Sequence, residues 1–217
     1  MQSTPRHAPR DAATNVVGIR QHRAAVEFAK ALSTVFNPFL CASAVFIIVS
    51  HAYSHSTREF WVLSAVSVFA YTVAPLLCLV FLYVTGRVTD FEMSDRFERE
   101  KLFLVIVVID LLAAVAYSLA QLPTPLRAMA WGYCASALGI MVITRYWKIS
   151  THAFGITGPF AILFGLFRLQ ALPYVALVPL VCWARLYLRA HTLAQVLGGV
   201  ILALATTVAF FRLFHLI

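Results

Sequence analysis

Two histidines in the second half of the chain lie in segments whose residue types suit phosphate chemistry. His152 follows Lys148 and Ser150, and His191 comes after Arg185 with five residues between them. Imidazole can act as a nucleophile or as a general acid and base, while guanidinium and ammonium groups hold phosphate oxygens. Charged groups between apolar segments are costly unless a partner or ligand neutralises them. A bound phosphate would be such a ligand.

A third polar segment, residues 89–101, contains five of the nine acidic residues and three of the seventeen basic ones, among them Arg96 and Arg99. Each of the three segments has a simpler interpretation when it is taken alone. A charge run is typical of a solvated loop with weak ion pairs, Lys148 suits an anchor at a membrane border, and a lone histidine such as His152 can cap a helix. The hypothesis of an anion site requires that all three segments converge on one face.

The composition excludes an ordinary soluble domain. Of the 217 residues, 61% are hydrophobic and 12% are charged, and the mean hydropathy is +0.84; soluble domains have about 25% charged residues. Basic residues at membrane borders explain the net charge of +8, so we expect no nucleic-acid partner. The four cysteines lie in apolar runs without CxxC spacing, which predicts buried free thiols and neither a disulfide framework nor a zinc site.

Seven apolar runs separated by short polar breaks make up most of the chain, and several approach the roughly 20 residues that a membrane-spanning helix needs. Because lipid offers the backbone no hydrogen-bond partners, we expect these runs to be helical. The predicted fold is all-α, a polytopic membrane bundle of six or seven transmembrane helices. The fifth run is short and contains Gly155, Gly158 and Pro159, so we expect it to be tilted, broken or re-entrant. The runs are Thr34–Tyr53, Trp61–Thr85, Leu102–Gln121, Arg127–Trp147, Ala153–Leu169, Pro173–Leu188 and Thr192–Phe214.

The first 33 residues are basic and poor in large apolar side chains. We expect Met1–Val17 to be a disordered tail and Gly18–Ser33 to be an interfacial helix. Residues 34–217 then form a single transmembrane domain.

If all seven runs cross the membrane, the loops at 86–101, 147–152 and 185–191 lie on the same side as the amino terminus. Most lysines and arginines fall on that side, and the positive-inside rule places it in the cytoplasm. We therefore expect an integral membrane protein whose polar site faces the cytoplasm. The basic residues on the opposite side are Arg58, Arg127, Arg168 and Arg212.

Taken in order, the three polar segments resemble the type 2 phosphatidic acid phosphatase superfamily, which also contains the vanadium haloperoxidases. That family has three blocks, Lys-x6-Arg-Pro, Pro-Ser-Gly-His and Ser-Arg-x5-His-x3-Asp. The matching residues are Arg99 in the first block, Ser150 and His152 in the second, and Arg185 and His191 in the third. Arg96 lies one helical turn before Arg99. The resemblance covers about residues 90–199 and implies that they form the catalytic core.

The chain departs from the family pattern at several positions. In the first block, Glu92 replaces the lysine and Glu100 replaces the proline. In the second, Ile149 and Thr151 replace the proline and the glycine. In the third, Ala184 replaces the serine and Gln195 replaces the aspartate. This pattern resembles a divergent branch of small membrane phosphatases. Our hypothesis is that Lys148 supplies the missing phosphate-binding lysine from another loop.

The resemblance implies a metal-independent lipid phosphatase without a cofactor. His191 would attack phosphorus to form a phosphohistidine, and His152 would protonate the leaving group and later help to deprotonate water. Arg185 would hold phosphate oxygens. The other substrate-binding residues would be Arg96, Arg99, Lys148, Ser150 and Thr151, with Asp90 near them.

Gln195 and Asp110 each leave alternatives open. Gln195, one turn after His191, can accept a hydrogen bond from the imidazole and fix its tautomer, or it can make an interhelical hydrogen bond without catalytic meaning. Since Gln195 is neutral, Asp90 or Asp95 would have to stabilise the imidazolium, or the rate is lower. Asp110, inside an apolar run, can hydrogen-bond while protonated, pair with an arginine, or line a polar route to the site.

A site at the membrane border suits a substrate with its phosphate in water and its tail in lipid. Phosphatidate, phosphatidylglycerophosphate and isoprenoid mono- or diphosphates all meet this description. Two other functions remain open, a lipid phosphotransferase with an acceptor other than water, and a non-catalytic lipid-binding membrane protein or transporter.

Overall fold

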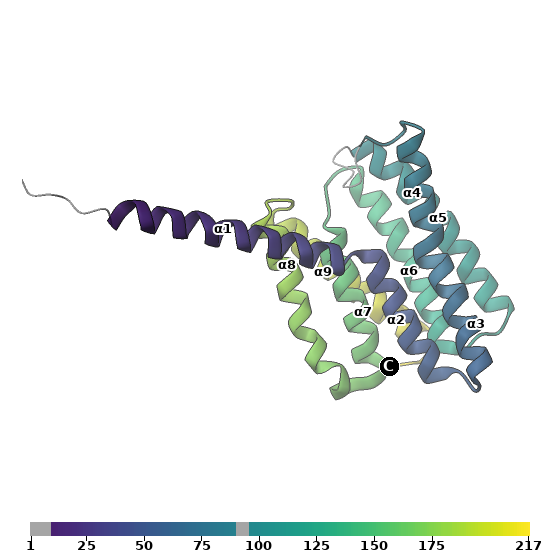
Figure 1. Ribbon diagram of the computed structural model, residues 1–217. Helices are drawn as coiled ribbons and strands as arrows, with labels where there is room; N and C mark the ends of the chain where they lie inside the picture. Colours follow the sequence, from purple (N-terminus) through teal and green to yellow (C-terminus); the bar gives the residue numbers. More distant parts are fainter. Residues whose placement is uncertain (1–9, 90–95) are drawn as a thin grey trace, which may run out of the picture.

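The described structure consists of helices and their connecting turns, so the predicted all-α fold is confirmed (Figure 1). The computed structural model describes residues 10–89 and 96–217, with side chains from 22 and, after the gap, from 98. Within these ranges no residue lies in a strand. The helices are α1 (Arg10–Val35), α2 (Pro38–Tyr53), α3 (Thr57–Val68), α4 (Ala74–Val84), α5 (Arg96–Leu119), α6 (Thr124–Thr144), α7 (Thr151–Phe167), α8 (Leu177–Tyr187) and α9 (Leu193–Leu213), with a π-helical turn η1 (Phe69–Val73) and a 3-10 segment η2 (Arg168–Ala176).

Within the described ranges, five helical stretches are long and apolar enough to span a membrane, and a sixth results if His22–Val35 of α1 and the helix α2, which meet at a bend of 49°, are taken as a pair. One of the five, Thr151–Tyr187, contains α7, η2 and α8. It therefore includes two of the runs that the sequence analysis counted separately. Counted in this way, the described residues hold five or six candidate spans, where the sequence predicted six or seven.

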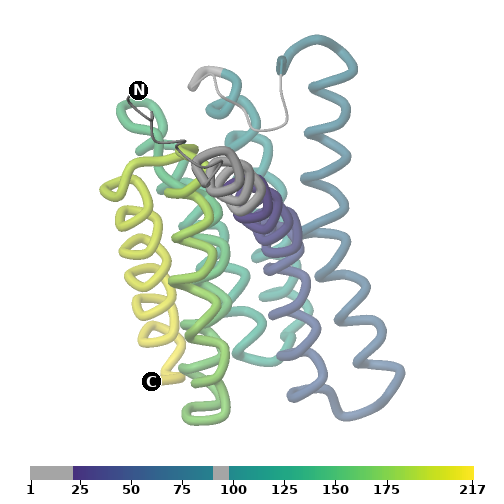
Figure 2. The backbone as a smooth tube through the Cα atoms, turned by 60° about the vertical axis from the view of Figure 1, so that its left-hand side comes forward, coloured from purple at the N-terminus to yellow at the C-terminus, as the bar shows by residue number. Residues whose placement is uncertain are grey.

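The chain reverses direction within Thr151–Tyr187. Residues near its two ends, His152 and Arg185, line the same cavity, and α8 packs back against α7 (Figure 1, Figure 2). Arg168, with a φ of 55°, follows the last residue of α7 at this reversal. The helix α7 continues through Pro159 without a break.

The amino-terminal helix belongs to the bundle more closely than the sequence suggested. The helix α1 begins at Arg10 and so includes residues 10–17, where the sequence predicted a disordered tail and where two consecutive alanines favour a helix; residues 1–9 lie outside the described ranges. Ala29 and Leu32 pack with Ala184 of α8. The predicted domain boundary after Ser33 therefore falls inside a helix whose last turns are part of the core.

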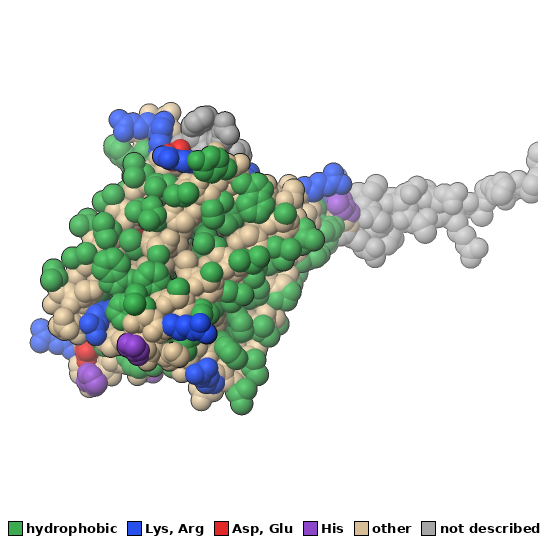
Figure 3. All heavy atoms as spheres, turned by 180° about the vertical axis from the view of Figure 1, so that it is seen from behind, with side chains coloured by type: hydrophobic (Ala, Val, Ile, Leu, Met, Phe, Trp, Pro, Cys, Tyr) green, Lys and Arg blue, Asp and Glu red, His purple; other side chains and the backbone are tan. Residues whose placement is uncertain are grey.

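Hydrophobic side chains cover the middle of the face shown in Figure 3, and charged side chains gather toward its two ends. This distribution suits helices whose middle portions lie in hydrocarbon. Inside the bundle, the run predicted as Trp61–Thr85 forms one stretch from Thr57 to Val84 that contains the π-helical turn η1. Pro75 follows this turn and has no N–H to continue regular helical bonding. The irregular turn places Tyr71 at the cavity wall.

Two glycines allow close helix approaches around the start of α7. A Cβ on Gly155 would come within 2.7 Å of Pro38 Cα at the start of α2. A Cβ on Gly199 of α9 would come within 2.4 Å of the Ser150 carbonyl oxygen. Neither distance is compatible with a larger residue unless the backbone moves. These contacts hold the segment that carries His152 against both α2 and α9.

Candidate functional site

A cavity of about 290 Å³ lies inside the bundle and is lined by residues of α2, η1 and the helices α4 to α8. Its polar end is made by the loops that the sequence analysis singled out. Its deeper walls are apolar except for Tyr71, Asp110 and Tyr133. The residues at the polar end are Asn37, Arg99, Lys148, Thr151, His152, Arg185 and His191.

The three polar segments do meet around this cavity. Arg99 comes from the start of α5, Lys148 and His152 come from the α6–α7 connection and the start of α7, and Arg185 and His191 come from the end of α8 and the loop after it. The two imidazoles therefore lie at the same end of the bundle and open into one cavity. The arrangement collects three cationic side chains and two histidines, which is a composition suited to a phosphate group.

Arg99 is buried, with 3% of its surface exposed. Its Nη2 donates a 3.1 Å hydrogen bond to the carbonyl of Ile149, which ties α5 to the segment before α7. Its Nε and Nη1 atoms have no hydrogen-bond partner in the described structure. A buried guanidinium with unpaired N–H groups beside a cavity is costly unless a ligand anion completes its bonding.

The turn after α8 directs His191 back toward Arg185. Arg189 has a left-handed φ of 53°, and the N–H of Ala190 donates to the carbonyl of Arg185 at 3.1 Å. This is the bonding of a Schellman cap, in which glycine is the usual residue at the left-handed position. Because arginine occupies that position here, the sequence carried no signal for the turn.

Gln195 makes the hydrogen bond that its spacing predicted. Its Oε1 lies 3.2 Å from Nδ1 of His191 and accepts a 3.0 Å bond from the N–H of Thr192, while the Thr192 hydroxyl accepts from Gln195 N. A backbone N–H can only donate, so the atom facing His191 is the amide oxygen, and Nδ1 must carry the proton. This leaves the Nε2 lone pair of His191 free to act as a nucleophile.

Burial, together with the positive charges of Arg185, Lys148 and Arg99, lowers the pKa of His191 to about 4, while the hydrogen bond to Gln195 acts in the opposite direction. His191 is therefore neutral at physiological pH when the site is empty. A neutral imidazole is the form that can attack phosphorus.

His152 is held by the amino-terminal helix. Its Nε2 lies 3.1 Å from the carbonyl oxygen of Ser33 in α1. Since a carbonyl can only accept, Nε2 carries the proton in this contact and Nδ1 is left for other partners. Nothing in the sequence near Ser33 pointed to this contact, because it joins residues 119 positions apart.

Ser150 caps the helix that carries His152. It does not line the cavity; it is fully buried and its hydroxyl accepts a long, 3.4 Å bond from Ala153 N as the cap of α7. Its own N–H donates to the carbonyl of Gln195. In this structure Ser150 positions the start of α7, and its predicted role in substrate binding stays a prediction. The cavity is instead lined by Thr151, the first residue of α7.

Several predicted site residues cannot be placed. Asp90 and Asp95 lie outside the described residues, and Arg96 begins α5 but its side chain is not described. Among the described side chains, no group of three or more His, Cys, Asp or Glu residues is arranged to hold a metal ion. The sequence analysis did not expect Asn37, which caps α2 through a bond from Phe39 N and lines the cavity. The sequence signal for it is an Asn-Pro pair at a helix start.

Comparison with models of known protein families finds none that matches this chain, and comparisons with curated proteins and with solved structures find no match either. Assignment of a function therefore depends on the residues and their geometry.

Proposed function

We propose that this protein is an integral-membrane lipid phosphate phosphatase that works through a phosphohistidine on His191. The observation that carries the proposal is that Arg99, Lys148, Arg185, His152 and His191, contributed by three separate segments, line one cavity. The resemblance of these segments to the type 2 phosphatidic acid phosphatases supports the same conclusion.

The proposed reaction has two displacements. Nε2 of His191 attacks phosphorus, the bond from phosphorus to the lipid oxygen breaks, and His152, which must first take up a second proton when the anionic substrate binds, gives that oxygen the proton on Nδ1. Water then attacks the phosphohistidine with His152 as general base, the P–N bond breaks, and inorganic phosphate leaves. Gln195 contributes by holding the His191 tautomer that presents Nε2. The contact between Ser33 and Nε2 of His152 leaves Nδ1 as the atom that exchanges protons with the substrate.

The cationic side chains would stabilise the transferring phosphoryl group. Arg99 and Arg185 are 3% and 5% exposed, so their charges act in a medium that screens them weakly. Fixed donors of this kind are worth most where negative charge develops in the transition state. The first N–H groups of α7, at Thr151 and His152, add the positive end of a helix dipole.

The surroundings of the site favour a lipid over a soluble ester. The cavity continues from its polar end between apolar side chains of helices that are long enough to span a membrane. We further propose that the polar end faces the cytoplasm, because most basic residues of the chain belong to the connections on that side.

The test is release of phosphate by the purified full-length protein in detergent, with EDTA present, from diacyl and prenyl phosphates. We expect vanadate-sensitive release that His191→Ala reduces at least 1,000-fold, to about the level seen when other covalent nucleophiles are removed. The exposed Lys30, which pairs with Glu27 on α1 at 2.9 Å, gives the control variant Lys30→Ala, which should keep full activity. Absence of phosphate release from every substrate would leave lipid binding without catalysis. Transfer of the phosphoryl group to an added alcohol in preference to water would identify a phosphotransferase.

A further inference from the structure

The cavity extends along one face of α5, from the phosphate end toward the middle of the bundle. Arg99, Phe103, Ile106 and Asp110 follow one another at helical spacing and all line it. At about 1.5 Å per residue, the distance along the helix from Arg99 to Asp110 is roughly 16 Å. The cavity is therefore much deeper than a phosphate group requires.

The walls between these two ends are apolar. Leu79 of α4 and Ala137 and Ile140 of α6 face the same cavity as Ile106. Its volume of about 290 Å³ lies at the low end for pockets that enclose a small molecule, which are roughly 300–1,000 Å³. A single hydrocarbon chain is the occupant that we assign to a space of this depth and volume.

The far end of the cavity is polar. Asp110 is 3% exposed, and it lies close enough to Tyr71 and Tyr133 to interact with both electrostatically. The hydroxyl of Tyr71 is buried without a hydrogen-bond partner in the described structure. An apolar chain that reached these groups would exclude water from them and leave them unpaired, which is unfavourable. The favourable space for a hydrocarbon chain ends before Asp110.

From these observations, and on the basis of the function proposed above, we infer that the substrate is a single-chain lipid phosphate or diphosphate whose main chain has about twelve carbons, the length of three isoprene units. Three bonds of an extended chain span about 3.6 Å, so roughly 16 Å corresponds to about thirteen bonds. Asp110 sets the upper limit of chain length and Ala137 sets the width. Neither residue contacts the phosphate, so each is a specificity determinant and not a catalytic residue.

The inference predicts a chain-length optimum. We would measure kcat/KM for prenyl monophosphates of one, two, three, four and eleven units, with linear alkyl phosphates of matching length to separate length from branching. Activity should rise to three units and fall at least tenfold by four. Equal or rising activity at four and eleven units would overturn the inference while the phosphatase function stands; no release from any of them would overturn the function itself.

Two variants should move the optimum in opposite directions. Ala137→Leu fills the cavity, so the ratio of activity on three units to activity on one unit should fall at least tenfold. Asp110→Ala removes the polar end, so activity on four units relative to three should rise at least fivefold. The control is Leu138→Phe, which adds volume on the exposed side of α6, the helix that carries Ala137. It should leave both ratios unchanged. Vanadate inhibition, measured with the shortest substrate, reports whether the phosphate end of each variant is intact. If both cavity variants keep vanadate inhibition and the wild-type ratios, the inference is wrong.

Discussion

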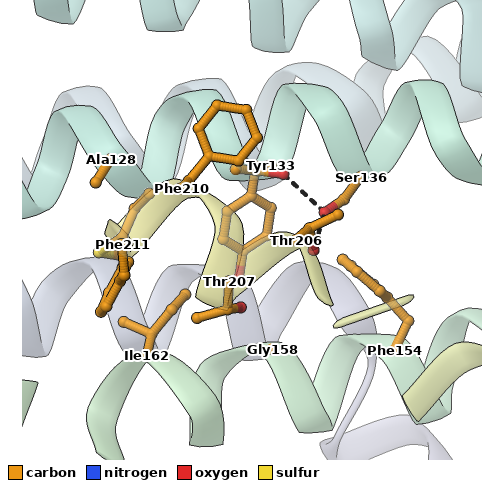
Figure 4. Close-up of a pocket in the computed structure, with 12 residues that line it drawn as sticks. Ala128, Tyr133, Ser136, Phe154, Gly158, Ile162, Thr206, Thr207, Phe210 and Phe211 are labelled. Atoms are coloured by element: carbon orange, nitrogen blue, oxygen red, sulfur yellow. Dashed lines mark hydrogen bonds between the residues drawn. The ribbon is translucent and has the colours of Figure 1, made fainter. Parts of the chain in front are cut away.

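Two hollow regions of this bundle differ in how their polar groups are satisfied. The first is the large cavity that holds Arg99 and the two histidines. The second is a pocket of about 20 Å³ between α6, α7 and α9 (Figure 4). In that pocket the Ser136 hydroxyl lies 2.7 Å from the Gly132 carbonyl and 2.9 Å from Oγ1 of Thr206, which itself donates to the Leu202 carbonyl.

In the small pocket Ser136 and Thr206 thus pair with each other and with backbone carbonyls, whereas two side chains of the large cavity leave polar groups without such partners. Arg99 and Tyr71 keep buried N–H and O–H groups without partners in the described structure. Buried polar groups in proteins are almost always paired, and in a membrane their pairing joins helices. Under the proposed function, the open N–H groups of Arg99 are the ones that a bound phosphate would pair.

The largest expected effect tests this distinction with two arginines. Arg99→Ala should reduce kcat/KM about 100- to 1,000-fold, because it removes a fixed donor from the site of developing charge. Arg99→Lys should also be poor, since an ammonium cannot reproduce the guanidinium fork. The control is Arg145→Ala, which breaks an exposed pair with Glu100 at 2.6 Å and should leave activity and melting temperature unchanged. Full activity in Arg99→Ala would contradict the proposal that this cavity binds the phosphate.

A smaller effect is expected at Gln195, which acts through His191. Gln195→Leu keeps the volume but loses the hydrogen bonds to Nδ1 and to Thr192 N, so kcat should fall about tenfold to 100-fold. Gln195→Asp should keep or raise activity, because a carboxylate also stabilises the imidazolium. The measurement is kcat with the phosphohistidine trapped by rapid acid quench. A complete loss in Gln195→Asp, with the protein still folded, contradicts this role.

Two glycines of α7 differ in how closely their surroundings are packed, one beside each hollow region. A Cβ on Gly155 would meet Pro38 at 2.7 Å, whereas a Cβ on Gly158, beside the small pocket, has nothing within 4 Å. Gly155→Ala should therefore destabilise the fold by about 1–3 kcal/mol through overpacking. Gly158→Ala should stabilise it by up to about 1 kcal/mol, because alanine favours a helix more than glycine does. Unfolding of the two variants in detergent measures the difference, and equal stabilities would show that α2 and α7 are not in close contact.

The smallest effects concern the charge of His191. Its pKa of about 4 in the folded protein lies below the ordinary 6.5, so the folded state binds fewer protons than the unfolded state between these values. Stability should fall as the pH drops from 6.5 toward 4, and it should fall less in His191→Gln. Melting temperatures at pH 7 and pH 5 test this, and an equal loss in both proteins would show that His191 titrates normally.

Lys148 lowers the same pKa by its positive charge. Lys148→Ala should therefore raise the pKa of His191, which NMR titration of the imidazole can follow, and it should weaken vanadate inhibition. Arg189→Ala, in the turn after α8, is a matched removal of a basic residue that does not line the cavity. If Lys148→Ala keeps full activity and vanadate affinity, the hypothesis that Lys148 supplies the missing phosphate-binding lysine is wrong.

The sequence by itself determined the features that depend on local periodicity and on hydrophobicity. Apolar run lengths predicted the helices to within a few residues, and the number of runs put the polar loops at one end. The four-residue spacing of His191 and Gln195 predicted their hydrogen bond, because residues i and i+4 are neighbours at the start of any helix. Such features are encoded within one or two helical turns.

Only the tertiary structure decided how these pieces meet. No local pattern predicts the contacts of His152 with Ser33 or of Arg99 with Ile149, because each joins distant segments. Nor does a local pattern show that the Ser150 hydroxyl caps α7. The depth of the cavity and its end at Asp110 arise from side chains on several helices at once. The physical reason is that helix formation follows from each segment's own backbone and hydropathy, whereas a buried polar group finds its partner only when whole helices pack together.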